Sequence, residues 1–439
     1  MTEQIDLQPV KGVRDFYPED QRVKTWLFSL WRDVARRFGY EEFDACVLEH
    51  EELYVRKAGD EITGQLYGFA DKSDRRLALR PELTPSLARM VMARGSALPL
   101  PARWFAIPQC FRYENVQRGR KREHYQWNMD VIGLASVAAE AELMAAQALF
   151  LREAGLGTSP EKADVVFRVS NRQVLQGVLA RLGITGDRFA QTCVIIDKRD
   201  KIGPEAMASE LFKLGIGDDA TKRISEVMAV SGHGAEGLAA ISAVVGKDNP
   251  GLVQLGELLE YAEPFGLGHL LRFDLSVIRG LSYYTGTVWE VFDSSGAMPR
   301  AIAGGGRYDA LIETLGGKPT PMAGFGMGDV VIIDILREKS LLPPLRRQVD
   351  DVVYPMSAKE IPVANKVARF LRKQGRVVVV DYSLRRFKHV VERAETVEGA
   401  SMLYVLGGNE VASGKATVKP LGQEGAKEYP VPLASLGAG

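Results

Sequence analysis

Residues 110–133, CFRYENVQRGRKREHYQWNMDVIG, gather polar side chains that suit phosphate chemistry. From Gln126 to Asp130, polar residues alternate with apolar ones, as in a strand with one buried face. Arg112 and Glu114 alternate in the same way before the loop. The pattern predicts two antiparallel strands with these side chains on one face, joined by a loop whose basic tip contains Arg118, Arg120, Lys121 and Arg122. On these residues alone, an ordinary hairpin with a solvated tip explains the segment equally well.

Arg279 is a second candidate, because it stands between the apolar run LSVI and Gly280, at the expected end of a strand. A guanidinium there suits a phosphate ligand, since it keeps its proton and offers a planar fork of donors. A structural salt bridge is the alternative. Tyr283 and Tyr284 follow, and one of two adjacent residues in a strand must point away from the site. We expect Tyr284 to point inward and Tyr283 to serve packing or a secondary contact.

The glycine run GFGMG at 324–328 is a weak nucleotide signal. Its spacing is G-x-G-x-G, whereas dinucleotide-binding turns carry G-x-G-x-x-G within a first strand-helix-strand unit. We therefore expect these glycines to allow close packing of a strand against a helix.

The elements that position these residues follow from periodicity. Apolar residues recur at helical spacing from 21 to 39, and a second helix is expected over 138–154. The runs VVFRVS from 165 and TCVIID from 192 predict short strands between helical stretches up to about 268.

Two prolines in LLPPLRR, residues 341–347, predict a linker. Beyond the linker, strands and helices alternate, which favours a compact, mostly parallel α/β domain. The expected order is strand 351–354, helix 358–374, strand 376–382, helix 384–396 and strand 401–406.

Composition sets further limits on the 439-residue chain. Its 56 basic and 56 acidic residues cancel, so contact with RNA must come from local patches such as residues 118–122. Cys46, Cys110 and Cys193 are isolated, which indicates neither a disulfide framework nor a zinc site. The acidic start and the absence of a long apolar run predict a cytoplasmic protein without a membrane span.

Several segments resemble one family in chain order. Residues 110–133 resemble motif 2 of class II aminoacyl-tRNA synthetases in its histidyl form. RGLSYYTGTVWE at 279–290 is similar to the histidine-specific signature, and GGGRYDALIETLGGKPTPMAGFGMG at 304–328 resembles the segment that leads into motif 3. KGVRDFYPED at 11–20 and LALRPELTPSLAR at 77–89 also resemble family landmarks.

The resemblance implies an α+β fold: an antiparallel-sheet catalytic domain with helices, a mostly helical insertion and a C-terminal α/β domain that binds the anticodon stem-loop. The implied division is catalytic 1–164, insertion 165–268, catalytic 269–340, linker 341–348 and anticodon-binding domain 349–439. The implied activity is histidine–tRNA ligase in a homodimer, with Mg-ATP, histidine and tRNA(His) as partners and no protein metal site.

The resemblance also assigns roles to residues. Arg112 and Arg279 are implied to hold the α-phosphate and to stabilise the charge that develops in catalysis. Other implied ATP ligands are Glu114, Arg120 and Arg122, and the implied contacts to the tRNA acceptor end are Gln117, Arg118 and Arg120. The implied histidine ligands are Glu82, Thr84, Gln126, Asp130, Tyr283 and Tyr284. Among them, Glu82, Thr84 and Gln126 would bind the ammonium, and Asp130 and Tyr284 the two imidazole nitrogens. His124 is expected to lie near the loop, behind the residues that contact the substrates, and not to act as a general base.

Two departures from the family pattern affect these expectations. Val331 takes the place of the motif 3 arginine that reaches the γ-phosphate, so we expect Arg120 and Arg122 to compensate. Cys46 occupies the place of the motif 1 proline, and this departure affects the expected dimer contact, which the family makes through motif 1. A histidine-sensing regulatory paralogue similar to the regulatory subunit of ATP phosphoribosyltransferase is the main alternative, and a catalytically inactive RNA sensor is a third.

Overall fold

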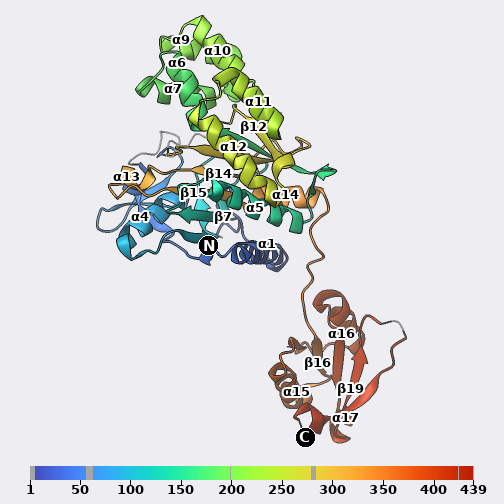
Figure 1. Cartoon of the computed structure of the whole chain (residues 1–439). Helices are drawn as coiled ribbons and strands as arrows, with labels where there is room; N and C mark the ends of the chain where they lie inside the picture. The colour runs from blue at the N-terminus through green and yellow to red at the C-terminus, as the bar shows by residue number, and fades with distance from the viewer. Residues whose placement is uncertain (1–4, 56–62, 198, 278–282, 424, 439) are drawn as a thin grey trace. The chain divides into compact units, whose positions relative to one another are not determined.

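The computed structural model of the chain describes residues 5–55, 63–197, 199–277, 283–423 and 425–438. It separates into two compact units, Met1–Leu342 and Pro343–Gly439 (Figure 1). Among the helices of these described ranges, none combines the length and the apolar character that crossing a membrane requires.

A sheet of ten described strands is the centre of the first unit. The order is β1-β5-β7-β15-β14-β13-β10-β12-β11, and β6 pairs with β7. Neighbours from β5 to β10 are antiparallel, as the class II resemblance implies. The bounds are Glu41–Glu42 (β1), Ala102–Ala106 (β5), Gln109–Phe111 (β6), Glu123–Ile132 (β7), Val165–Asn171 (β10), Ser231–His233 (β11), Leu271–Asp274 (β12), Thr287–Asp293 (β13), Ala303–Arg307 (β14) and Met322–Gly328 (β15).

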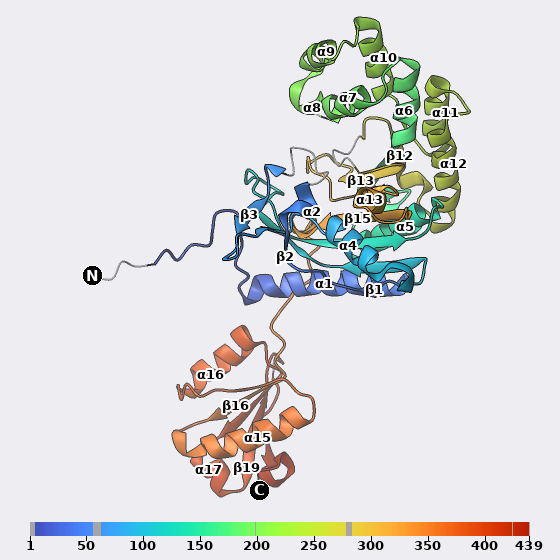
Figure 2. The same cartoon turned by 90° about the vertical axis from the view of Figure 1, so that its left-hand side faces the viewer.

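One face of this sheet carries the main hydrophobic core. Trp127, Met129 and Val131 of β7 are fully buried there, while the alternate residues point to the opposite face. The long helix α1 runs along the sheet (Figure 2), where Trp31 stacks on Trp127 with ring centroids 5.9 Å apart. Helices that contribute to this core include α1 (Pro18–Arg37), α5 (Ala138–Glu153), α12 (Pro250–Ala262) and α14 (Asp329–Glu338).

The opposite face is bordered by shorter elements. A three-stranded sheet has the order β2-β4-β3, and α4 and α13 pack on each other through a second hydrophobic cluster. Their bounds are Leu48–His50 (β2), Tyr67–Ala70 (β3), Arg76–Leu79 (β4), Glu51–Val55 (α2), Thr84–Arg94 (α4) and Leu311–Thr314 (α13). The expected helices at 21–39 and 138–154 are confirmed as α1 and α5.

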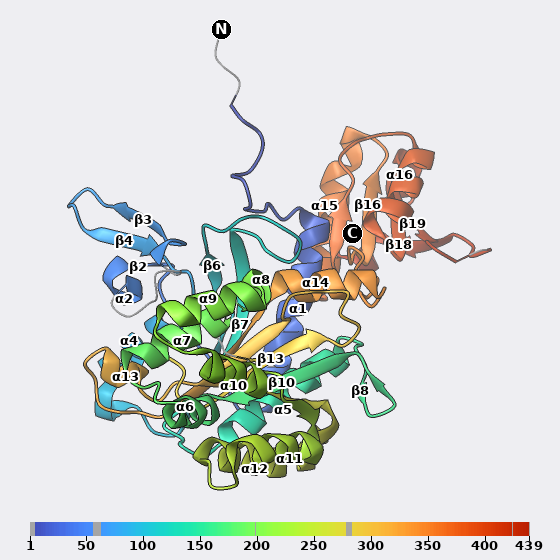
Figure 3. The same ribbon diagram turned by 90° about the horizontal axis from the view of Figure 1, so that it is seen from above.

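The segment predicted as an insertion differs from expectation in two places. First, β10 pairs with β13 and β12, and β11 pairs with β12, so residues 165–171 and 231–233 belong to the main sheet. Second, TCVIID is not a strand but part of a helix that buries Cys193 and Ile196 on one side and exposes Val194. A short apolar run cannot distinguish a strand from a buried helix face. Figure 3 shows α11 beside α12, and the remaining elements are α6 (Arg172–Arg181), α7 (Asp187–Asp197), α8 (Arg199–Ile202), α9 (Pro204–Lys213), α10 (Asp218–Met228), α11 (Gly234–Val245), β8 (Thr158–Ser159) and β9 (Lys162–Ala163).

The second unit is a five-stranded sheet in the order β17-β16-β18-β19-β20, with separate hydrophobic clusters beneath α15 and α16. The pairs of β16 with β17 and β18 are parallel, but β18–β19 and β19–β20 are antiparallel, so the expected mostly parallel sheet is mixed. The reason is the short connection after β18, since a parallel crossover needs a dozen or more residues. The bounds are Asp351–Pro355 (β16), Ile361–Lys373 (α15), Val378–Val380 (β17), Phe387–Arg393 (α16), Met402–Leu406 (β18), Gly408–Ala412 (α17), Lys415–Pro420 (β19) and Tyr429–Pro432 (β20).

A buried ion pair ties β14 to α5, and further hydrogen bonds of the same arginine reach the segment before α5. The Arg307 guanidinium donates to both Glu140 carboxylate oxygens, at 2.7 and 2.6 Å, and to the carbonyl oxygens of Leu134 and Ser136. The side chains of Arg307 and Glu140 are 4% and 0% exposed. Such a pair is costly to break because the remaining charge stays buried without compensation.

We expect Arg307→Ala to lower the free energy of unfolding of the first unit by about 3–5 kcal/mol. Arg32→Ala is the matched control, because the Arg32–Glu42 pair is 37% and 38% exposed, and exposed pairs contribute about 0–1 kcal/mol. Chemical denaturation followed by tryptophan fluorescence measures both, since all five tryptophans lie between Trp26 and Trp289. Equal losses in the two variants would contradict a structural role for the buried pair.

Candidate active site

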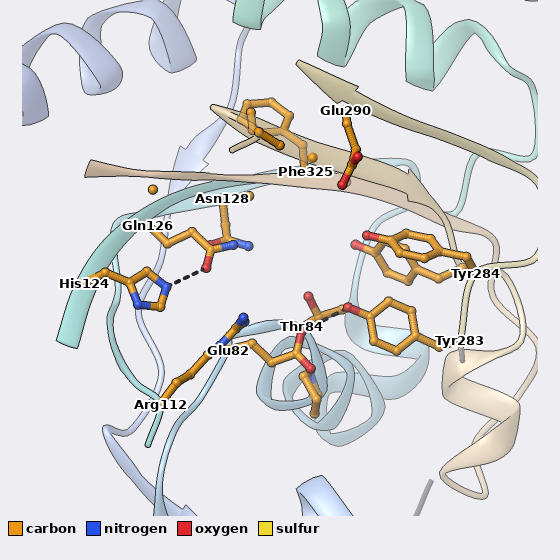
Figure 4. A pocket seen from close by; sticks show the side chains of 18 of the residues that line it. Glu82, Thr84, Arg112, His124, Gln126, Asn128, Tyr283, Tyr284, Glu290 and Phe325 are labelled. Atoms are coloured by element: carbon orange, nitrogen blue, oxygen red, sulfur yellow. Dashed lines mark hydrogen bonds between the residues drawn. The ribbon is translucent and has the colours of Figure 1, made fainter. Parts of the chain in front are cut away.

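A cavity of about 1120 Å³ opens on the sheet face that the main core leaves free. Figure 4 shows Gln126 and Asn128 reaching into it from β7, with Glu82, Arg112 and Tyr283 approaching from other segments. The predicted site residues that line it are Glu82, Thr84, Arg112, Glu114, Arg120, Gln126, Asp130, Tyr283 and Tyr284. The structure therefore brings together residues up to two hundred positions apart in the chain.

Glycines form the floor of this cavity. In the register of the sheet, Gly324 lies opposite Asp130 and Gly326 opposite Asn128. A Cβ added at Gly324 would lie 2.0 Å from Asp130 Oδ1, and one at Gly326 would lie 1.6 Å from Gln126 Nε2. These glycines thus let side chains of β7 lie across β15. The expected role in packing a strand against a helix is wrong at these two positions, because the space above them holds cavity side chains.

Asp130 is the most buried acid of the cavity, with 2% of its surface exposed. Its Oδ1 accepts a hydrogen bond from the Tyr308 hydroxyl, and among the described residues its buried Oδ2 has no hydrogen-bond partner. Burial raises the pKa of Asp130 to about 7, although the Tyr308 bond opposes this shift. An N–H donor that reached Oδ2 would satisfy this orphaned acceptor.

Glu82 and Tyr283 form a polar pair at the start of α4. The Tyr283 hydroxyl donates to Glu82 Oε2 at 3.0 Å, and Thr84 lies in the first turn of the helix. Arg80, 2% exposed, supports this segment by donating to the carbonyl oxygens of Gln109 and Ala45. A carboxylate flanked by hydroxyl groups is a suitable receptor for an ammonium ion.

Both tyrosines contribute to the cavity. Tyr284 lies so close to Gly306 that a Cβ on this glycine would meet its Cδ1 at 2.6 Å. The Tyr283 hydroxyl meets Glu82, which is a secondary contact of the kind expected for this residue. These residues are not in a strand, since β13 begins at Thr287, so period-two alternation does not govern them.

The basic loop ends in a tight turn. Gln117 and Arg120 pair through their backbones, and Gly119 between them has a φ of +69°. Arg112 donates from Nε to the Pro81 carbonyl oxygen at 2.8 Å, and Arg120 pairs with Glu114 at 2.9 Å.

Other predicted residues of this loop do not line the cavity. The Arg122 guanidinium lies 3.9 Å from the centroid of the Tyr113 ring, so the expectation that it binds ATP is not supported by its position. Gln117 lies outside the cavity lining, and Arg118 pairs with Glu338 on α14. Arg279 lies outside the described residues.

His124 lines the cavity in a neutral state. Burial, with a smaller effect from Arg112, lowers its pKa to about 3, and its Nε2 lies 3.3 Å from Gln126 Oε1. A histidine with so low a pKa is a poor proton acceptor near neutral pH, which argues against a general base. The expected place behind the site is wrong, however, because His124 lines the cavity itself.

Sequence reasoning missed several lining residues, namely Asn128, Arg168, Glu290, Arg300 and Tyr308. Asn128 belongs to the polar alternation of β7, and Tyr308 follows the glycines of β14. Both residues lie in segments that the sequence motifs already mark, so these motifs could have predicted them. Arg168 lies opposite Glu290 in the register of β10 and β13. These strands are more than a hundred residues apart in the chain, so no local sequence pattern predicts the pairing.

The antiparallel sheet, its covering helices and an open face with a polar cavity define the class II aminoacyl-tRNA synthetase fold. The Histidyl-tRNA synthetase family model matches residues 12–328. The histidine–tRNA ligase of Arabidopsis thaliana chloroplasts and mitochondria is 45% identical over 98% of this chain and 86% of its own length. That of Haloarcula marismortui is 34% identical over 97% and 96%. The crystal structure of histidyl-tRNA synthetase from Nostoc sp. PCC 7120 superposes with a TM-score of 0.78 at 25% identity, covering 99% and 98%.

The chain belongs to the histidyl-tRNA synthetase family. The predicted family and the predicted class II fold are thereby confirmed.

We expect Gly324→Ala to abolish most use of the amino-acid substrate, because the added Cβ would lie 2.0 Å from Asp130 Oδ1 and displace this side chain. Gly328→Ala is the control on the same strand, since a Cβ there meets no atom within 4 Å among the described residues. Steady-state kinetics with varied histidine distinguish the two, and equal KM values for histidine would contradict the glycine-floor account.

Asp130 also predicts a pH dependence of stability. Between its ordinary pKa of 3.8 and its folded pKa of about 7, the folded protein holds a proton that the unfolded chain has lost. Stability relative to Asp130→Asn should therefore fall as pH rises from about 4 to about 7 and level off above it, by about 1.4 kcal/mol per unit of pKa difference. Denaturation of both proteins across this pH range measures the difference, and a constant difference would rule out the shifted pKa.

Proposed function

We propose that the cavity is the active site of a histidine–tRNA ligase, which activates histidine with ATP and transfers it to the 3′ end of tRNA(His). The observation that carries this proposal is the buried Asp130, whose Oδ2 lacks a partner among the described residues. An imidazole N–H supplies the missing donor, whereas an apolar side chain of similar size leaves the acceptor unpaired. The second imidazole nitrogen would meet the Tyr284 hydroxyl, which also belongs to the cavity lining.

The other ends of the amino acid would be held by separate groups. Glu82, Thr84 and Gln126 would bind the ammonium group. Arg112 and Arg279 would hold the α-phosphate, with Glu114 and Arg120 binding other parts of ATP. ATP would enter as its magnesium complex, and the carboxylates of Glu114 and Glu290 line the cavity where such an ion would need oxygen ligands.

The reaction follows from this arrangement. A histidine carboxylate oxygen attacks the α-phosphorus, a new O–P bond forms, and pyrophosphate leaves. Arg112 and Arg279 would stabilise the charge on the phosphoryl oxygens as that bond forms. A ribose hydroxyl at the 3′ end of the tRNA then attacks the acyl carbon, and AMP leaves with the bonding electrons. Gln117, Arg118 and Arg120 would contact the acceptor end.

We further propose the domain division 1–164, 165–268, 269–340 and 349–439 around a linker at 341–348, with the correction that β10 and β11 belong to the catalytic sheet. The C-terminal unit would bind the anticodon. Its surface supports this role, because Tyr382, Leu384 and Phe387 are exposed next to the basic residues Arg385, Arg386 and Lys388. Exposed aromatic and basic side chains together bind single-stranded bases and phosphates.

Homodimerisation and a cytoplasmic location complete the proposal. Val47 and Leu48 are 40% and 44% exposed beside Cys46, and these apolar side chains would be covered by a second copy. The cysteines of the described residues are free thiols, which suits a reducing compartment. A histidine-sensing regulator without aminoacylation is the weaker alternative, because the proposed catalytic arginines and the basic C-terminal unit have no use in it.

A chain that ends at Arg346 tests the proposed division of labour. The two units have separate hydrophobic cores, so the truncated chain should keep histidine-dependent ATP–pyrophosphate exchange near the full-length rate but charge tRNA(His) poorly. Full-length protein is the control in both assays. Unchanged charging would contradict the anticodon role, and absence of exchange in the full-length protein would contradict the ligase function.

A further inference from the structure

Arg300 stands at the edge of the cavity in the connection between β13 and β14. It lines the cavity together with Gly119, Arg120 and Val331, although no motif marks it in the sequence. Val331 is 7% exposed, and its apolar side chain cannot neutralise an anion. The Arg300 guanidinium beside Val331 carries a positive charge and can neutralise an anion.

The tip of the basic loop fixes where Arg300 lies. A Cβ added at Gly119 would be 3.0 Å from Arg300 Cδ and 3.3 Å from Val331 Cγ2. The stem of Arg300 and the side chain of Val331 therefore both reach the same glycine. Arg300 Nε donates to the Arg118 carbonyl oxygen at 3.2 Å, which orients the guanidinium and engages one of its five N–H groups.

The charge around Arg300 favours a polyanion. Burial, together with the nearby positive charge of Arg120, lowers the pKa of Arg300, and Glu114 opposes this effect. Glu114 already pairs with Arg120 at 2.9 Å, and no ion pair of Arg300 occurs within the described part of the chain. Two arginines thus share one carboxylate, and a ligand with several negative charges would relieve their repulsion.

We propose that Arg300, supported by Val331 and Gly119, binds the terminal phosphates of ATP. This inference rests on the proposed function and adds a residue to it. Arg300 would take the role expected of Arg122, which lies against Tyr113. Val331 would contribute by its small size, because a small apolar side chain leaves room for the Arg300 stem. The ligand class is a polyphosphate chain.

The test uses the full-length protein and two measurements. Arg300→Ala should raise the KM for ATP in histidine-dependent pyrophosphate exchange by roughly 10- to 100-fold, the range of one lost charge-assisted contact, and leave the KM for histidine unchanged. Arg300→Lys should restore part of the loss. Adding Val331→Arg to Arg300→Ala should recover ATP binding, because it returns a cation to the same place. Arg337→Ala, an arginine of α14 that is 51% exposed and does not line the cavity, is the control.

Calorimetric titration with inorganic tripolyphosphate provides the second measurement and needs no activity. Weaker binding by Arg300→Ala than by the wild-type protein supports the inference. A wild-type KM for ATP together with wild-type tripolyphosphate binding overturns it, and so does an equal rise in the KM for ATP and histidine, which indicates a general structural role. If the wild-type protein binds tripolyphosphate through Arg300 but shows no exchange, the proposed ligase function fails while the polyphosphate site stands.

Discussion

The bare floor of the cavity is the constraint on which the rest of the site depends. Gly324 and Gly326 stand in the middle of the main sheet, where glycine weakens a strand because it has no side chain to pack. The sheet tolerates them because β7 and β14 pair with β15 on both sides and because Phe325 and Met327 fill the core on the other face. One strand thus serves both the core and the cavity.

Buried charge follows a second rule in this structure. Where the role is structural, opposite charges are paired: Arg307 meets Glu140, and Arg14 meets Glu123 at 2.8 Å and Asp329 at 2.9 Å. In the cavity, by contrast, Asp130 has a tyrosine hydroxyl on one oxygen and, within the described part of the chain, no hydrogen-bond partner on the other. An unpaired buried acid is costly in free energy, so the presence of Asp130 indicates a ligand that donates a hydrogen bond to its second oxygen.

The same distinction explains what the sequence could predict. The alternation of β7 correctly placed Gln126 and Asp130 on the cavity face, because strand geometry fixes side-chain direction. The loop after Arg112 has no such period, so Arg120 and Arg122 looked equivalent although one lines the cavity and the other stacks on Tyr113. Arg300 was beyond prediction, since it meets Gly119 only through the fold. The TCVIID helix was missed because apolar runs of that length fit either a strand or a helix.

We infer that a glycine floor and a buried aspartate create a site that activates histidine and rejects amino acids of similar size. Initial rates of ATP–pyrophosphate exchange with histidine, glutamine and phenylalanine test it most directly. We expect exchange with histidine and rates with phenylalanine lower by about 10⁴-fold or more, as for a site whose buried polar groups would be left unpaired. Comparable rates with phenylalanine would contradict it.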